Sequence, residues 1–280
     1  MNSKDISWAD IFAIRTELKE LHYQTDNSEK PSESGLKSTQ VDNLVIASMK
    51  SYAKNTFVQF LKSKIQNDEV VSDLINRFRI GTKRDGAAIF WQVDINGKVN
   101  YFALCNFNPI TGGCITTPNL TKIPHFFGEN QLVSENKTIA IVEKVETAIL
   151  MSWIMPQNTW LAFGNCEPVY MMFDILKNKK IVLYPDAGKY ELWSKMAKNL
   201  KQNRNLDVKV STYLKTEIEK LPFEQHKGII NLYDCAIRFN WKPQPQKKES
   251  VSQSEQVFQN MILQKPILKK FINRLELIYT

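Results

Sequence analysis

Two carboxylates stand at the ends of short apolar runs about forty residues apart. Glu143 closes the run Thr-Ile-Ala-Ile-Val at 138–142, and Asp186 follows the run Ile-Val-Leu-Tyr-Pro at 181–185. If both runs are strands of one parallel sheet, the two acids meet at the sheet edge where open α/β sheets build their sites. Such a pair can hold a hard divalent cation such as Mg²⁺ against phosphate oxygens. The alternative is that both are helix caps or exposed strand-end acids.

The segment around these acids alternates between strand-like and helix-like patterns. Strands are predicted at 138–143, 159–163, 180–184 and 207–212, and helices at 146–155, 168–176 and 189–203. Strands that alternate with helices form right-handed βαβ units and a parallel sheet covered on both faces. The sequence therefore predicts an α/β fold in which this sheet positions the acids.

The region before the sheet has a different pattern. Apolar residues at 40–79 recur at helical spacing and predict two or three helices. Strand-like runs at 86–94 and 98–104, joined by a turn with Asn96 and Gly97, predict a β-hairpin. Residues 106–124, rich in Pro and Gly, predict a loop. Further upstream we expect a short amphipathic helix at 7–21 and a flexible linker at 24–39.

The region after the sheet holds a short apolar element at 229–237 that carries Asp234, and then a Pro-, Gln- and Lys-rich linker. Residues 257–279 show helical spacing, which fits a helix that packs on its own domain or one that docks onto a protein partner. The predicted domains are an N-terminal helix and linker at 1–40, a helical and hairpin subdomain at 41–135, the parallel-sheet domain at 136–240, and the linker and C-terminal helix at 241–280.

Composition narrows the partners and the location. The 280 residues carry a net charge of +8 with a pI near 9.1, which favours a polyanionic partner such as DNA or RNA, or only keeps the protein soluble. No signal-peptide core or membrane-length apolar run is present, so we expect a soluble, cytoplasmic protein. The four cysteines lack zinc-ligand or disulfide-framework spacing and are expected to be free thiols. P-loop and GxGxxG motifs are also lacking.

Three short motifs together resemble a Toprim domain, and specifically the primase-like Toprim proteins of Bacteroidetes plasmids and mobile elements. These motifs are Ile-Val-Glu ending at Glu143, Trp-Leu-Ala-Phe-Gly ending at Gly164, and Pro-Asp-Ala-Gly-Lys-Tyr-Glu-Leu-Trp at 185–193. Upstream, Arg-Ile-Gly-Thr-Lys at 79–83, the hairpin, and His-Phe-Phe-Gly at 125–128 are similar to the region that precedes the Toprim core in bacterial primases. The similarity covers roughly residues 55–237.

The resemblance implies phosphoryl transfer on nucleic acid that depends on Mg²⁺ or Mn²⁺. Glu143 and Asp186 would be the catalytic acids and, with Asp234, the metal ligands, while Gly164 and Gly188 would shape the loops at the site. Basic residues would contact the nucleic-acid backbone or an incoming triphosphate: Arg79, Lys83, Arg84 and Lys189.

Three departures from the family pattern reduce the negative charge of the site. Val145 stands where relatives carry a second Glu, Ala187 follows Asp186 in place of an Asp-x-Asp, and Asn231 leaves Asp234 as a single downstream acid. Two hypotheses therefore stay open. The first is a Mg²⁺-dependent primase-like nucleotidyltransferase or nuclease, with catalysis attenuated. The second is a non-catalytic Toprim-fold component that binds nucleic acid or a partner in a replication, mobile-element or defence complex.

Overall fold

The computed structural model describes residues 38–108, 110, 112–114, 125–133, 137–164, 170–222, 225 and 227–243. These residues belong to one compact unit that ends at Pro243. The helices predicted at 7–21 and 257–279 lie outside the described residues, as does nearly all of the predicted linker at 24–39. No helix among the described residues is both long enough and apolar enough to cross a membrane.

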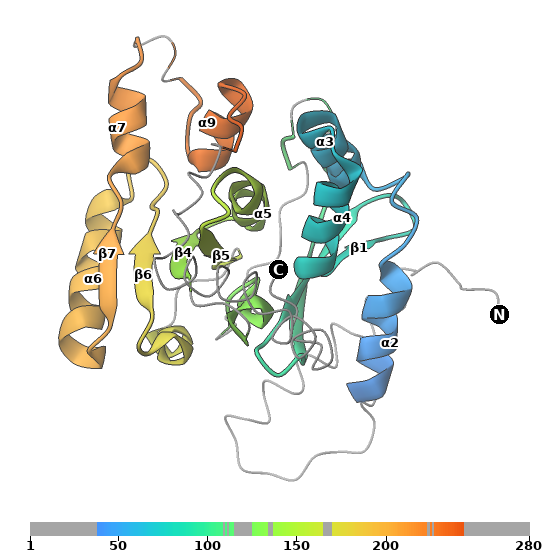
Figure 1. The fold of residues 1–280 in the computed structure, drawn as a ribbon, viewed down its shortest axis with the longest axis horizontal. Coiled ribbons are helices and arrows are strands. Elements are labelled where there is room, and N and C mark those ends of the chain that lie inside the picture. Colours follow the sequence, from blue (N-terminus) through green and yellow to red (C-terminus); the bar gives the residue numbers. More distant parts are fainter. Residues whose placement is uncertain are drawn as a thin grey trace, which may run out of the picture. The chain divides into compact units, whose positions relative to one another are not determined.

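A four-stranded parallel sheet forms the centre of the unit, as the alternating pattern predicts (Figure 1). Its strands lie in the order β5-β4-β6-β7, and every neighbouring pair is parallel. The bounds of the strands are β4 Thr138–Val142, β5 Asn158–Ala162, β6 Lys180–Leu183 and β7 Asp207–Val210. The first strand in sequence therefore lies between the second and the third.

Side chains of the sheet alternate between two cores, because successive residues of a strand point to opposite faces. Ala140 and Val142 of β4 join the core that contains helix α5 (Val145–Ile154). Ile139 and Ile141 join the core on the other face, with helix α6 (Tyr190–Arg204). Both faces are thus covered by helices, which confirms the predicted α/β class.

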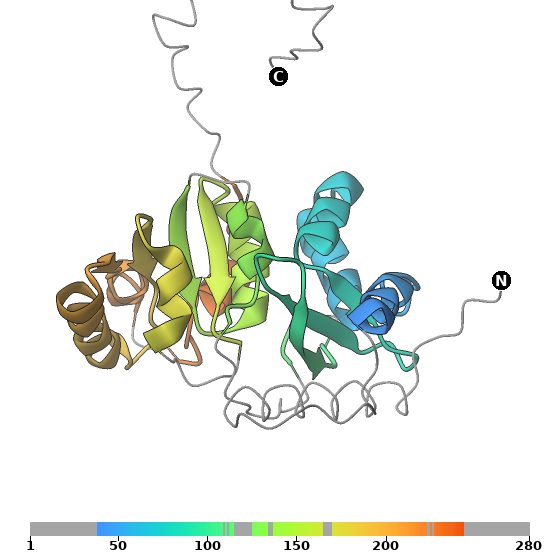
Figure 2. The same cartoon turned by 90° about the horizontal axis from the view of Figure 1, so that it is seen from below.

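A second, antiparallel sheet precedes the parallel one, and its strands lie in the order β1-β2-β3. The bounds are β1 Ile80–Thr82, β2 Ala88–Val93 and β3 Val99–Cys105. Strands β2 and β3 are the predicted hairpin, whereas β1 was not predicted, because three residues are too few to show a period. Three helices precede β1, in agreement with the two or three predicted. They are α2 Ser38–Ser48, α3 Thr56–Ile65 and α4 Asp68–Arg77 (Figure 2).

Every residue of β2 is buried, because helices cover both faces of the hairpin. Phe90 packs edge-on against Phe57 of α3, with ring centroids 5.2 Å apart. Trp91 faces the other way and donates its indole N–H to the Ser48 hydroxyl at the end of α2, over 2.9 Å. The hairpin therefore packs between α2 and α3 and is not exposed on the surface.

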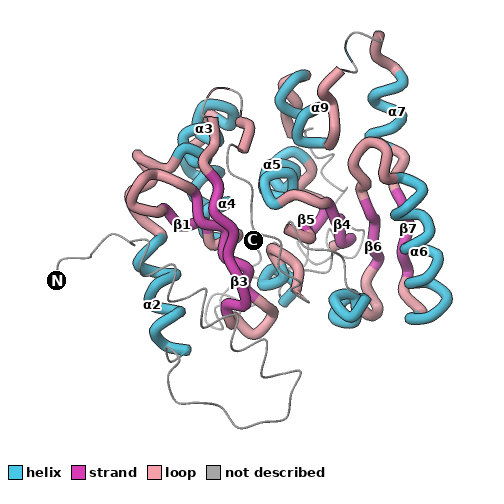
Figure 3. Tube along the Cα trace, turned by 180° about the vertical axis from the view of Figure 1, so that it is seen from behind, coloured by secondary structure: helices cyan, strands magenta, loops and turns pink. Residues whose placement is uncertain are grey.

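The two sheets share one core. That core contains Phe57 and Phe90 from the first region together with Ala140, Trp160 and Tyr233 from the second. Phe127 forms an antiparallel bridge with Ala162 at the edge of β5, through hydrogen bonds of 2.8 and 3.1 Å. Helix α9 (Leu232–Arg238) lies beside α5 (Figure 3). The parts predicted as 41–135 and 136–240 thus pack as one body.

The expectation of four free thiols is wrong for one pair: Cys105 and Cys114 form a disulfide, with Cα atoms 5.9 Å apart. Phe107 and Cys114 form an antiparallel bridge, which turns the chain back beside β3 and brings the two sulfurs together. The sequence spacing gives no sign of this turn. Cys235 is a buried free thiol, and Cys166 lies outside the described residues.

Three short elements also differ from the prediction. The described part of the segment predicted as a helix at 168–176 forms a 3-10 helix, η2 (Tyr170–Leu176). Another 3-10 helix, η1, covers Glu129–Val133. Helix α7 (Tyr213–Glu219) follows β7 and was not predicted, because seven residues span only about two turns and give a weak periodic signal.

Candidate functional site

The acids of the two strand ends meet where the direction of strand order reverses. Glu143 directly follows β4, and Asp186 follows β6, the strand beside it. In the order β5-β4-β6-β7 the chain first moves from β4 to one side and then crosses to the other side. Open α/β sheets bind ligands at such a switch point, beyond the carboxyl ends of the strands. The sheet topology therefore places Glu143 and Asp186 at the position where a site is expected.

The backbone at Glu143 is held by the end of β5. Gly164 donates its N–H to the Glu143 carbonyl over 3.0 Å, one step beyond the bond from Phe163 to Val142. Gly164 has a φ of +63°, a conformation that favours glycine. This conformation lets the chain after β5 end beside Glu143, and the role of Gly164 in shaping the site stays a prediction.

The loop that carries Asp186 is tied at both ends. Lys189 donates its N–H back to the Asp186 carbonyl over 3.0 Å, and Gly188 between them has a φ of +79°. Ala187 donates its N–H to the carbonyl of Ile230 over 2.6 Å. These bonds form a tight turn that opens helix α6 and leaves little freedom to the Asp186 backbone.

Asp186 is buried, with 6% of its surface exposed, and its carboxyl group lies next to that of Glu143. Its pKa is raised to about 8, chiefly by burial and also by the hydrogen bond and like charge of Glu143, while Lys144 and Lys189 act in the opposite direction. The carboxyl groups of Asp186 and Glu143 are thus neighbours. Their close approach agrees with a site in which both groups could bind one cation.

A lysine of the same turn completes the charged group. The ammonium group of Lys189 forms an ion pair with the Glu143 carboxylate. Both side chains reach solvent, with 44% of Lys189 and 28% of Glu143 exposed. Lys189 was predicted as a nucleic-acid contact, and the structure places it directly on the predicted catalytic acid.

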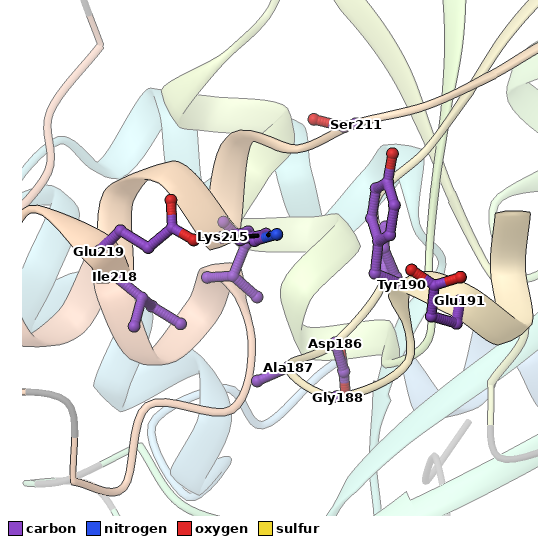
Figure 4. Close-up of a pocket in the computed structure, with 11 residues that line it drawn as sticks. Asp186, Ala187, Gly188, Tyr190, Glu191, Ser211, Lys215, Ile218 and Glu219 are labelled. Atoms are coloured by element: carbon purple, nitrogen blue, oxygen red, sulfur yellow. Dashed lines mark ion pairs between the residues drawn. The ribbon is translucent and has the colours of Figure 1, made fainter.

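A cavity of about 430 Å³ opens beside Asp186, between the first turn of α6 and helix α7 (Figure 4). Tyr190 and Glu191 of α6 lie across it from Lys215 and Ile218 of α7. The lining residues combine apolar and polar groups: Pro185, Asp186, Ala187, Gly188, Tyr190, Glu191, Ser211, Leu214, Lys215, Ile218 and Glu219. The cavity thus offers apolar walls with polar groups around one buried acid.

Asp234, predicted as a third metal ligand, has another role here. Its Oδ2 accepts the N–H groups of Ile230 and Asn231, over 2.8 and 3.0 Å, and the Asn231 side chain accepts the N–H of Asp234 in return. This reciprocal capping box starts helix α9. The Ile230 carbonyl accepts the N–H of Ala187, so Asp234 supports the Asp186 loop through the backbone of Ile230.

The three departures from the family pattern have structural explanations. Val145 is buried in the core at the start of α5, so its position faces the interior. Ala187 is exposed in the loop and contributes its N–H to the bond with Ile230. Asn231 is buried as the cap of α9.

The other predicted basic contacts lie in the antiparallel-sheet region, around strand β1. Arg79 and Arg84 are exposed there. Lys83 is buried, with 3% of its side chain exposed, and its ammonium group forms an ion pair with Asp85. Of these three side chains, only the two arginines present their charge to solvent.

The donor set fits a hard cation that takes much of its coordination from elsewhere. In the described part of the chain, no three His, Cys, Asp or Glu side chains gather so that they could hold a metal ion. Mg²⁺, however, usually keeps several waters and binds through one or two carboxylates and substrate phosphates. Glu143 and Asp186 could supply those carboxylates.

Sequence reasoning missed the residues that line the cavity, above all Tyr190, Lys215 and Ile218. Tyr190 lies within the motif at 185–193, but its side chain had no predicted role. The two α7 residues could not be found, because that helix itself was not predicted.

The chain is similar to one protein family and to solved structures. A family model described as a domain of unknown function, DUF6371, matches residues 55–187, which include both Glu143 and Asp186. No curated protein matches the chain. A solved structure described as the DnaG primase catalytic domain bound to ssDNA has a TM-score of 0.44 and 15% identity, over 72% of this chain and 80% of that one.

Proposed function

We propose that this chain is a primase-like Toprim protein that acts on nucleic acid by phosphoryl transfer with Mg²⁺ or Mn²⁺, in the service of plasmid or mobile-element DNA. One observation carries the proposal: the carboxyl groups of Glu143 and Asp186 come from two neighbouring strand ends and interact electrostatically at the switch point of the sheet. Strand-end acids with only local capping roles would have no reason to meet.

In this proposal Glu143 and Asp186 would hold the cation, which would neutralise negative charge on the reacting phosphate. The raised pKa of Asp186, about 8, means that a cation at the pair would favour the charged form of this buried carboxyl group. The turn at 186–189 and the bond from Gly164 fix the two carboxyl groups before any ligand arrives. Such pre-organisation lowers the cost of binding.

The cavity beside Asp186 would take the base and sugar of a nucleotide. Its volume lies within the range of about 300–1,000 Å³ that is usual for small-molecule sites. The ring of Tyr190 offers a stacking surface, and Leu214 and Ile218 offer apolar walls. Ser211 and Glu191 provide polar groups for the hydroxyls of a sugar.

A second candidate function is nucleic-acid binding without catalysis. The specific observation in its favour is the ion pair between Lys189 and Glu143, which already neutralises the charge that a metal ion would meet. The net charge of +8 and the exposed Arg79 and Arg84 would supply phosphate contacts.

Primer-synthesis and nuclease assays with Mg²⁺ or Mn²⁺ test the first candidate against the second. We expect activity in the unmodified chain, a loss of at least about a hundredfold in Glu143→Gln and Asp186→Asn, and wild-type activity in Asp174→Asn. Asp174, which lies on η2, is a matched control because it is an exposed acid paired with Arg204. If every form is inactive and still binds an oligonucleotide equally well, the enzyme hypothesis is wrong and the binding module is favoured.

A further inference from the structure

Lys189 reaches the acid pair because of the turn that precedes helix α6. The bond from its N–H to the Asp186 carbonyl closes the turn, and the left-handed Gly188 reverses the chain. The side chain therefore starts beside Asp186 and ends on Glu143, the acid of the neighbouring strand. A residue one or two positions further along α6 would start from a different face of the helix.

The contact puts a positive charge on the group that a metal ion would need. A cation site formed by Glu143 and Asp186 includes the Glu143 carboxylate, and the ammonium group of Lys189 is already paired with that carboxylate. An ammonium ion and a divalent cation cannot both lie in contact with one carboxylate without strong repulsion. Binding of a metal ion at the pair therefore competes with Lys189.

The pair is built so that it can open. With 44% of its surface exposed, the Lys189 side chain has room to turn away into solvent, and exposed ion pairs of this kind contribute little to stability. A phosphate group that approaches the site would attract the same ammonium group. The lysine can thus pass from the carboxylate to a phosphate without a rearrangement of the backbone.

We propose that Lys189 is the resident cation of the Glu143–Asp186 pair, and that a phosphate-bearing ligand draws it off Glu143 and so opens the pair to a divalent metal ion. The inference rests on the proposed function, because it takes the pair as a cation site. It adds that metal binding and phosphate binding are coupled through one side chain. By linkage, each ligand then raises the affinity for the other.

Binding of Mn²⁺, measured by electron paramagnetic resonance of the free ion, tests the competition without any turnover. We expect Lys189→Met and Lys189→Gln to bind Mn²⁺ about three- to fivefold more tightly than the unmodified chain, since the competing ion pair is removed. Lys177→Met, which removes an exposed lysine after η2, should leave the affinity unchanged. Circular dichroism melting confirms that each variant is folded, and two substitutions at 189 guard against one that is not.

The double variant with Glu143→Gln and Lys189→Met locates the effect. The gain in Mn²⁺ affinity should disappear in it, whereas a gain that persists would place the ion elsewhere and overturn the proposal. Unchanged or weaker Mn²⁺ binding in both single variants at Lys189 would overturn it as well.

The coupling is tested with a labelled single-stranded DNA oligonucleotide, whose affinity is measured by fluorescence anisotropy with and without Mn²⁺. We expect Mn²⁺ to raise the affinity several-fold in the unmodified chain and by a smaller factor in Lys189→Met. Equal factors in the two proteins would contradict the coupling. These binding results can be distinguished from those of the primer-synthesis and nuclease assays. If the protein is inactive but the Lys189 variants still bind Mn²⁺ more tightly, the proposed activity is wrong, while the proposed role of Lys189 as resident cation still holds.

Discussion

At the scale of single residues, the site depends on how a buried acid is kept neutral. Asp186 is removed from water and lies against a second carboxyl group, so its charged form is disfavoured. The folded-state pKa of Asp186, about 8, lies above the ordinary value of 3.8 for an Asp side chain in water. Between these two pH values the folded chain therefore binds more protons than the unfolded chain. The resulting stability is complete below about pH 4 and is lost as the pH rises toward 8.

Asp186→Asn should therefore remove this pH dependence. Compared with the unmodified chain, we expect little gain in the free energy of unfolding at pH 5 and a gain on the order of a few kcal/mol at pH 8.5, because the amide stays neutral. Urea denaturation at the two pH values measures the difference. Asp174→Asn, at an exposed acid paired with Arg204, is the control; an equal gain at both pH values for Asp186→Asn would contradict the assignment.

The sequence identifies Glu143 and Asp186, because strand ends in a parallel sheet have a fixed place and both acids follow clear apolar runs. It does not predict the pairing of Lys189 with Glu143. That contact depends on the left-handed Gly188 and on the bond that closes the turn, and neither can be read from residue spacing. Nor does the sequence predict the burial of Lys83, a lysine in a basic stretch whose side chain pairs with Asp85.

At the scale of elements, the Asp186 loop relies on a helix end that lies later in the chain. Asp234 holds Ile230 and Asn231 through their N–H groups, and the Ile230 carbonyl holds the loop through Ala187. The start of helix α9 is therefore a support for the site, although Asp234 makes its hydrogen bonds to the backbone.

Asp234→Ala should weaken this support. We expect a loss of about 1–2 kcal/mol in the free energy of unfolding, because a capping side chain and two hydrogen bonds are lost. Hydrogen–deuterium exchange at 185–189 should become faster, since the segment that holds the Ala187 N–H is freed. Lys220→Ala, at an exposed lysine paired with Glu217, should change neither quantity; unchanged exchange at 185–189 in Asp234→Ala would show that the loop is held by other contacts.

Most elements can be predicted because they are long enough to show a period. Helices α3 and α4 also carry capping residues, Asn55 and Asn67, that accept hydrogen bonds from their first turns. The elements that escape prediction are β1 and α7, which are short, and η2, whose 3-10 geometry differs from the helix expected there. The sequence thus predicts the parallel sheet, but it does not predict helix α7, which forms one wall of the cavity.

At the scale of the whole molecule, the shared core decides how the chain can be divided. Buried residues of the antiparallel region and of the parallel sheet belong to one cluster, and Phe127 extends the edge of β5. A boundary at 135 would divide the residues of this cluster between two parts. The sequence cannot show this, because apolar residues do not reveal which other residues cover them.

The fragment 136–243 should therefore not fold by itself, whereas 38–243 should. We expect the shorter fragment to aggregate or to lack a cooperative thermal transition, because it exposes apolar surface on α5 and β5 that the first region normally covers. Size-exclusion chromatography and circular dichroism compare the two. A monomeric 136–243 fragment with a sharp transition would show that the parallel-sheet part is an independent domain.

The hydrogen bond from the Tyr233 hydroxyl to the Gly112 carbonyl, 2.8 Å long, joins residues 121 positions apart. During synthesis the ribosome releases the hairpin region long before α9, so the pocket for the Tyr233 ring beside Phe60 stays open until nearly all of the described chain has emerged. Nascent chains with such late closing contacts expose apolar surface for longer and need protection from aggregation. Slower translation of the last described helix would then lower the yield of native protein more than slower translation of α2.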